Sequence, residues 1–218
     1  MLMSWPWKWR SVAAAAAIAV SLFSGAAAAV AAESQPAEAE ALPAVGSRFI
    51  LNTHDGRTVT DEDFRGRHLL VFFGYTHCPD ICPSSLLTVA RVLELLGDQA
   101  KHVQPLFITV DPARDTRQVL SEFVPHFDAR IVGLTGNEQM IERVAKGYRA
   151  KYARVDGRDG TYSVDHTATL FHMGPAGEYI GRFPYETTAE KIAEDLRASL
   201  KASVGSNTQT DDRASVKQ

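Results

Sequence analysis

Apolar stretches and helical patterns alternate through the middle of the chain. Residues His68 to Phe73 are almost continuously apolar, which is typical of a strand buried on both faces. The helical pattern that follows, from Ser84 to Leu96, stops at Gly97. A second strand is expected over Gln104 to Val110, followed by a helix that Asp115 or Thr116 caps and that runs to about Val124. A third strand is expected over Arg130 to Leu134, followed by a helix from about Asn137 to Tyr148.

Hairpins flank this repeating block. An Asp-Gly pair predicts a turn between Phe49 to Leu51 and Thr58 to Thr60. A second hairpin is expected between Lys151 to Val155 and Thr161 to Val164, and a third between Thr167 to Met173 and Glu178 to Phe183. A last helix is expected over Thr188 to Leu200. This order predicts an α/β fold with a central mixed sheet flanked by helices, in which the central strands are parallel and the edges antiparallel.

The residues outside this block divide the chain into segments. Residues 11–32 carry no charge and follow Lys8 and Arg10, so 1–32 is expected to be a signal peptide or a membrane anchor. Cleavage after Ala31 and retention as an anchor are both open. In either case the domain is expected outside the cytoplasm, in the periplasm or anchored to the outer side of the inner membrane. Residues 33–45 have the composition of an acidic linker. Residues 46–202 are expected to form one domain, and residues 203–218 are expected to be a disordered tail.

Charge and cysteine content narrow the function. The formal net charge is −3, and the sequence holds no basic block of the kind that binds nucleic acid, so we expect no nucleic-acid partner. The only two cysteines, Cys78 and Cys82, are too few for a disulfide scaffold. They are therefore expected to carry chemistry.

Both cysteines lie where the strand over His68 to Phe73 feeds the next helix, the end at which open α/β sheets usually place their sites. With Cys82 as N-cap and Pro83 as first helical residue, the helix dipole would favour thiolate. A disulfide, a redox couple and a soft-metal site are all open. Three intervening residues, rather than the two of thioredoxin-like redox motifs, favour sulfurs that converge on one ion.

Histidines are the other candidate ligands. His166 precedes the strand that should lie beside the cysteine strand, at a position where thioredoxin-like folds usually carry a proline. From the residues alone, a ligand role and an ordinary role for His166 are equally open. Loop positions are expected for His54, His77, His102 and His126. Core or edge positions are expected for His68 and His172. Met140 is expected to fill the core.

Three motifs in this order resemble the Sco (SenC) family of copper-binding assembly proteins. They are Gly74-Tyr75-Thr76-His77-Cys78-Pro79-Asp80-Ile81-Cys82-Pro83, Val110-Asp111-Pro112-Ala113-Arg114-Asp115-Thr116 and Val164-Asp165-His166-Thr167. The resemblance runs from about Leu51 to Leu200 and implies a thioredoxin-like fold with an inserted hairpin. It also implies that Cys78, Cys82 and His166 bind copper. We interpret Asp111 to Thr116 as a turn and helix cap, and Asp165 as either a turn cap or a neighbour of the ligands.

The resemblance implies partners and two rival functions. Two thiolates and an imidazole suit Cu(I) and also Cu(II), whereas zinc would require a fourth ligand. A copper carrier would deliver the ion to the dinuclear copper site of cytochrome c oxidase subunit II or to another copper enzyme, with other copper chaperones as further partners. The alternative is a thiol–disulfide oxidoreductase that keeps the copper-ligand cysteines of that subunit reduced. Cys78 and Cys82 would then be the redox pair, and His166 would be secondary.

Overall fold

A single mixed sheet organises the part of the chain that the computed structural model describes, residues 45–46 and 48–215 with side chains as far as Ser203. Its strand order is β2-β1-β5-β4-β3-β8-β9. The strands are β1 Ile50–Thr53, β2 Thr58–Thr60, β3 His68–Gly74, β4 Val103–Thr109, β5 Val132–Thr135, β8 Thr169–Met173 and β9 Tyr179–Pro184. β3, β4 and β5 run parallel, and the outer pairs are antiparallel. The predicted sheet is confirmed.

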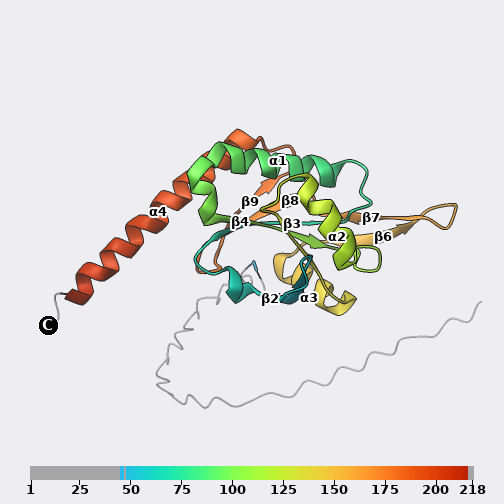
Figure 1. Ribbon diagram of the computed structural model, residues 1–218, viewed down its shortest axis with the longest axis horizontal. Helices are drawn as coiled ribbons and strands as arrows, with labels where there is room; N and C mark the ends of the chain where they lie inside the picture. Colours follow the sequence, from blue (N-terminus) through green and yellow to red (C-terminus); the bar gives the residue numbers. More distant parts are fainter. Residues whose placement is uncertain (1–44, 47, 216–218) are drawn as a thin grey trace, which may run out of the picture. The chain divides into compact units, whose positions relative to one another are not determined.

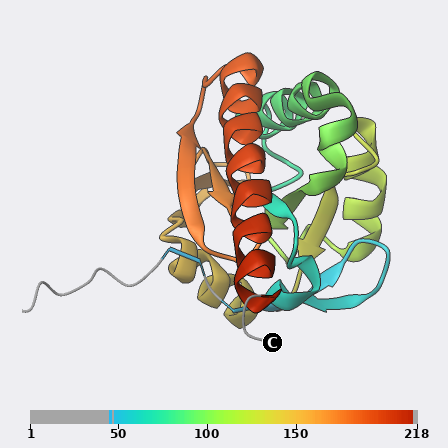
Figure 2. The ribbon, with the colours of Figure 1, turned by 90° about the vertical axis from the view of Figure 1, so that its left-hand side faces the viewer.

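Helices lie on both faces of this sheet (Figure 1). They are α1 Ile81–Leu96, α2 Arg117–Phe123, α3 Glu138–Tyr148 and α4 Ala189–Ser215, with short 3₁₀ helices η1 Asp61–Phe64, η2 Gly97–His102 and η3 Val124–His126. α1 packs against α4 on one face, an arrangement also seen from the side in Figure 2. α3 lies on the opposite face. The predicted α/β architecture is therefore confirmed.

The core is centred on β3 and β4, which are buried along their whole length. Phe72, Phe73 and Phe107 are each no more than 1% exposed. Burying one such side chain stabilises the fold by roughly 1.5–3 kcal/mol. Because β3 is held on both edges and both faces, the loop that leaves it after Gly74 starts from a fixed point.

A second, two-stranded sheet is formed by β6 Tyr152–Asp156 and β7 Tyr162–His166. The two strands pair antiparallel, with Tyr152 opposite His166. This is the hairpin inserted between α3 and β8, and it projects away from the main sheet in Figure 1. Its base therefore lies next to β8, which pairs with β3.

Three local predictions are wrong. α1 begins at Ile81 with Asp80 as N-cap, so Cys82 is the second helical residue rather than the cap. Pro83 is still tolerated, because the amide groups of a helix's first turn have no partner within the helix. α4 continues to Ser215 instead of ending near Leu200, since no proline interrupts it. Met140 is 38% exposed and does not fill the core.

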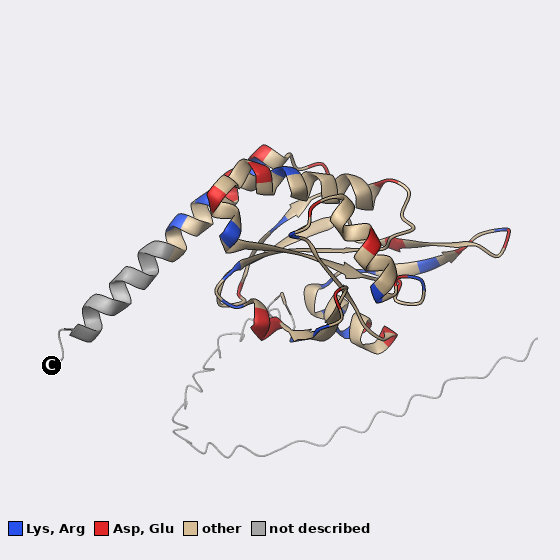
Figure 3. Ribbon diagram, in the orientation of Figure 1, with Lys and Arg blue, Asp and Glu red and all other residues tan. Residues whose placement is uncertain are grey.

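Charged residues of both signs are interspersed along the described elements (Figure 3). Most ion pairs join exposed neighbours, such as Lys146 Nζ and Glu142 Oε1 at 2.6 Å on α3. Exposed pairs of this kind contribute little to stability. Among the described residues no helix has both the length and the apolar character needed to cross a bilayer. The segment 1–32, for which a signal or anchor is expected, and residues 33–44 of the expected linker lie outside the described residues.

Candidate metal centre

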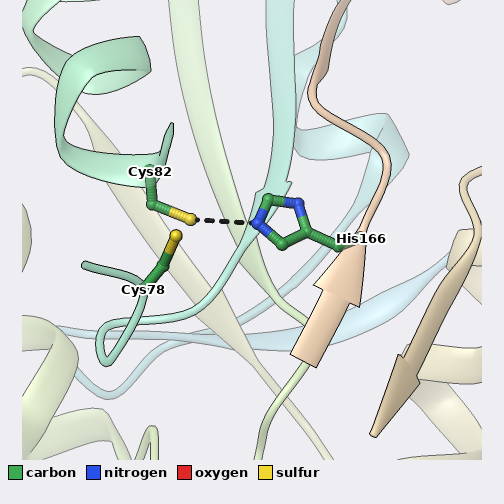
Figure 4. A group of neighbouring side chains, drawn as sticks. All are labelled: Cys78, Cys82 and His166. Carbon is green, nitrogen blue, oxygen red and sulfur yellow. Dashed lines mark hydrogen bonds between the residues drawn. The ribbon is translucent and has the colours of Figure 1, made fainter. Parts of the chain in front are cut away.

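Cys78, Cys82 and His166 lie together at the carboxyl end of β3. Their three potential ligand atoms are all within 4.8 Å of one another, and Cys82 Sγ is 3.3 Å from His166 Nε2. Figure 4 shows the side chains pointing toward a common centre, Cys82 from α1, Cys78 from the preceding loop and His166 from the end of β7. Both cysteines are free thiols. The structure thus brings together all three residues predicted from the sequence.

Gly74 and Tyr75 make room for the cysteines and fix their loop. A Cβ at Gly74 would lie 2.7 Å from Cys82 Sγ and 2.8 Å from the ring of Phe107, so only glycine leaves space for the buried thiol. The amide of Cys78 donates to the carbonyl of Tyr75 at 3.2 Å, which turns the loop back toward α1. Cys82 is fully buried, whereas Cys78 is half-buried. One thiol is therefore enclosed and the other can be approached.

The imidazole of His166 is held in one orientation. Its ring makes edge contacts with Phe72 and Tyr75, at centroid distances of 5.9 and 5.8 Å. Nδ1 lies 3.3 Å from the carbonyl oxygen of Thr167. Because a carbonyl can only accept, this contact keeps the proton on Nδ1 and leaves the Nε2 lone pair facing Cys82. That is the tautomer a metal ligand needs.

Burial shifts both groups toward their uncharged forms. It raises the pKa of the Cys82 thiol well above its usual range, and the nearby Cys78 raises it further. The expectation that the helix N-terminus favours thiolate is therefore wrong for Cys82, because its burial disfavours the charged form. Burial likewise lowers the pKa of His166 and keeps the imidazole neutral. A cation placed among these atoms would supply the positive charge that a buried thiolate lacks.

The donor set fits a soft metal ion. Metal–sulfur and metal–nitrogen bonds run about 2.0–2.3 Å, so one ion can bridge donor atoms separated by the distances seen here. Two sulfurs and one imidazole nitrogen suit copper and leave a coordination position open. Cys78 and His166 are only partly covered, and His166 also lines a groove of about 770 Å³ beside α3 and the hairpin. A second donor can therefore reach the centre from outside.

The other histidines lie away from the centre. His77 is exposed, with Nδ1 3.1 Å from Thr76 Oγ1, and His102 and His126 are exposed as well. His54 is half-buried and accepts from the amide of Gly133 at 3.1 Å. The core positions expected for His68 and His172 are confirmed. They are 2% exposed and lie 3.0 Å apart, Nδ1 to Nε2.

Sequence reasoning missed the connections made by the segment Asp111 to Asp115. Thr116 caps α2 as expected, by accepting from the amide of Val119. Asp115 does not cap this helix; it is fully buried and accepts three hydrogen bonds from Thr76 and Thr109. The sequence held a signal for these bonds. Thr116 alone is enough to cap α2, so the neighbouring Asp115 carboxylate needs a partner elsewhere. Asp165 is exposed, and its charge acts on His166 from the surface.

Comparison with known proteins identifies a family. The SCO1/SenC family model matches residues 37–201. The human protein named SCO1 homolog, mitochondrial, is 36% identical over 162 residues, which are 73% of this chain and 54% of that protein. A SCO2-like protein of Rickettsia felis is 36% identical over 157 residues, 71% of this chain and 77% of that protein. This chain spans about half the length of the human and mouse relatives.

Solved structures give the same fold. Bradyrhizobium japonicum ScoI with copper bound matches with a TM-score of 0.68 and 39% identity over 72% of this chain and 99% of that one. Yeast Sco1 with copper bound matches with a TM-score of 0.67 and 30% identity over 73% of this chain and 90% of that one. The thioredoxin-like fold expected from the resemblance is thereby confirmed.

Proposed function

Because this chain belongs to the SCO1/SenC family, and because three soft donor atoms converge at one open centre, we propose that it is a copper carrier. Cys78, Cys82 and His166 hold the ion, as Cu(I) and also as Cu(II). The observation that carries this proposal is the convergence of the two sulfurs and Nε2 within 4.8 Å. The copper-bound structures of its relatives ScoI and Sco1 support the choice of metal.

An incomplete ligand shell suits transfer rather than storage. Three protein ligands leave an open position, and the half-buried Cys78 lies on the exposed side of the centre. A recipient's own thiol or imidazole can enter there before the carrier's ligands leave. We propose that the recipient is the dinuclear copper site of cytochrome c oxidase subunit II, with another copper enzyme or copper chaperone as further partners.

Metal analysis of purified variants tests this function. The wild-type protein with reduced cysteines is expected to bind one copper per chain, and His166→Ala to lose the ion or hold it at least about tenfold more weakly. His126→Ala is the matched control, because His126 is exposed and lies at the end of η3, away from the centre. Undiminished affinity in His166→Ala, or an equal loss in His126→Ala, would remove His166 from the site.

A thiol–disulfide oxidoreductase is the second candidate. The proximity of two free thiols favours it, since Cys78 is half-buried and can attack while the enclosed Cys82 resolves the mixed disulfide. The raised pKa of Cys82 argues against fast thiol exchange at that sulfur. A Cys82→Ser variant that traps a mixed disulfide between Cys78 and subunit II would favour this function.

We also propose that the domain works outside the cytoplasm. The basic start and the uncharged residues 11–32 support export, either as a cleaved leader to the periplasm or as an anchor in the inner membrane. Mass determination of the mature N-terminus distinguishes the two outcomes.

A further inference from the structure

The three ligands of the candidate metal centre come from two separate segments. The cysteines belong to the loop after β3 and the first turn of α1, whereas His166 ends β7 of the projecting hairpin. Along β7, Tyr162, Val164 and His166 share one side of the strand, because side chains alternate with a period of two. A metal site of fixed geometry requires both segments to be attached to a common body.

The turn between β4 and α2 makes one of these attachments through Asp115. The Thr76 amide donates to Asp115 Oδ2 at 3.0 Å, and Thr76 Oγ1 donates to Oδ1 at 2.6 Å. Thr109, the last residue of β4, donates to Oδ2 at 2.7 Å. The carboxylate is fully buried. It therefore joins the end of a core strand to the residue that lies two positions before Cys78.

Asp111 and Arg114 make the other attachment, to Tyr162 at the start of β7. The Tyr162 hydroxyl donates to Asp111 Oδ1 at 2.9 Å, and Arg114 Nη1 donates to the Tyr162 carbonyl at 3.0 Å. Arg114 Nε in turn donates to Asp111 Oδ2. The guanidinium lies 3.6 Å from the centroid of the Tyr162 ring. The hairpin strand is thus held by its backbone, its hydroxyl and its ring.

The two attachments belong to one rigid turn. The amide of Asp115 donates to the carbonyl of Asp111 at 2.9 Å, and Thr109 Oγ1 accepts from the amide of Asp111 at 2.9 Å. Thr135 of β5 donates to the carbonyl of Asp115 at 3.1 Å. We call this unit, formed by Asp111, Arg114 and Asp115, the bracket. It is anchored on two central strands and reaches both ligand-bearing segments.

We propose that the bracket positions the metal ligands: its Asp115 arm sets the cysteine loop, and its Asp111–Arg114 arm sets the strand that carries His166. None of these three residues supplies a ligand atom to the centre. Their effect on copper is indirect, through the separation of the two sulfurs from Nε2. This inference rests on the proposed copper function and adds to it the residues that fix the geometry of the site.

Thr76→Val is the sharpest variant, because it removes the hydroxyl bond to Asp115 and keeps the size of the side chain and the amide bond. Copper affinity is expected to fall about 10–100-fold, as it does when partners of metal ligands are removed. The sulfur-to-copper charge-transfer band of the Cu(II) complex is expected to shift as well. Thr76→Ser keeps the hydroxyl and is expected to restore both. Thr58→Val, at an exposed threonine of β2, is the matched control.

Tyr162→Phe tests the other arm. It removes the donor to Asp111 and keeps the ring over Arg114, so the nitrogen hyperfine coupling of the Cu(II) complex is expected to change while the sulfur band changes less. A merely structural role would lower the melting temperature without changing either signal. Wild-type spectra and affinity in both Thr76→Val and Tyr162→Phe would overturn the inference and leave the copper function standing.

A measurement on the copper-free protein separates the two proposals. The exchange rate of the Thr76 and Cys78 amide hydrogens is expected to rise about tenfold in Thr76→Val and to stay unchanged in Thr58→Val, since an opened loop exchanges faster. Unchanged exchange in Thr76→Val would contradict the bracket even if the wild-type protein bound no copper. Absence of copper binding in the wild-type protein would instead contradict the proposed function alone.

Discussion

The two ends of β3 each carry a cluster of titratable side chains. At the carboxyl end, the potential ligand atoms of Cys78, Cys82 and His166 lie within 4.8 Å of one another. At the amino end, His68 Nδ1 and His172 Nε2 lie 3.0 Å apart and share a hydrogen bond. Both clusters are built from side chains that bind protons and metals. Among the described residues, the first cluster has two partly exposed members, Cys78 and His166, whereas both histidines of the second are buried.

The difference lies in how the nitrogen atoms are used. His68 has both of its ring nitrogens engaged, Nδ1 with His172 and Nε2 with Ser203 Oγ at 3.1 Å. His166 has Nδ1 on a carbonyl and Nε2 facing a thiol sulfur, which is a weak hydrogen-bond partner but a strong metal ligand. The two sites thus differ in what the second ring nitrogen faces, and residue type alone does not decide this.

Acidification should affect both ends, but in different observables. At the carboxyl end the largest effect is expected on copper affinity, because the buried Cys82 thiol must lose its proton to bind and its pKa is raised. For each proton that binding releases, copper affinity falls by about tenfold for every pH unit of acidification. At least about a hundredfold loss of copper affinity is therefore expected from pH 8 to 6. Competition titrations with a copper chelator at several pH values measure this. Affinity that is independent of pH would contradict the site.

At the amino end, acid is expected to act on folding stability. Burial and the neighbouring His68 lower the pKa of His172 from 6.5 to about 4, and burial also lowers that of His68. Between these two pH values the unfolded chain binds more protons, so the free energy of unfolding falls as the pH drops. The loss from His172 amounts to at most about 3 kcal/mol. Denaturant titrations from pH 7 to 4 measure it.

His172→Gln is the control for that experiment, since glutamine keeps a hydrogen-bonding side chain and does not titrate. Its stability is expected to depend less steeply on pH than that of the wild-type protein. Its copper affinity at pH 7 should be unchanged, because His172 lies at the other end of β3. An equal pH slope in the two proteins would show that the buried pair does not govern acid sensitivity.

A smaller effect is expected from filling the space next to the thiol. Gly74→Ala places a methyl group 2.7 Å from Cys82 Sγ, which must displace the sulfur or the ring of Phe107. Overpacking of this kind costs about 1–3 kcal/mol of stability and should weaken copper binding as well. Gly181→Ala, where no atom lies within 4 Å of the added carbon and the backbone is not in the left-handed region, controls for a methyl group without a clash. Unchanged copper affinity in Gly74→Ala would show that the thiol has room to move.

Much of this arrangement was predictable from the sequence. The apolar run from His68 to Phe73 predicts the central strand because both its faces are buried, and the Cys-x3-Cys motif marks its carboxyl end. The grouping of His166 with the cysteines depended on the resemblance to a family, since 84 residues separate it from Cys82. Local sequence does not encode such a contact.

The remaining features depend on tertiary packing. The raised pKa of Cys82 arises from the burial of its side chain in the core, which no local pattern reports. The bracket is a further example. Asp115 was interpreted as part of a turn and cap because its partner Thr76 lies 39 residues away. Its role follows from burial and from the pairing of β3 with β4.

In the proposed centre, two sulfurs and one imidazole nitrogen hold the copper. X-ray absorption at the copper edge counts these ligands directly in the loaded protein. We expect two sulfur scatterers and one histidine nitrogen in the wild-type protein, and loss of the nitrogen in His166→Ala with both sulfurs retained. A shell of nitrogen and oxygen ligands only, or a histidine signal that survives in His166→Ala, would contradict it.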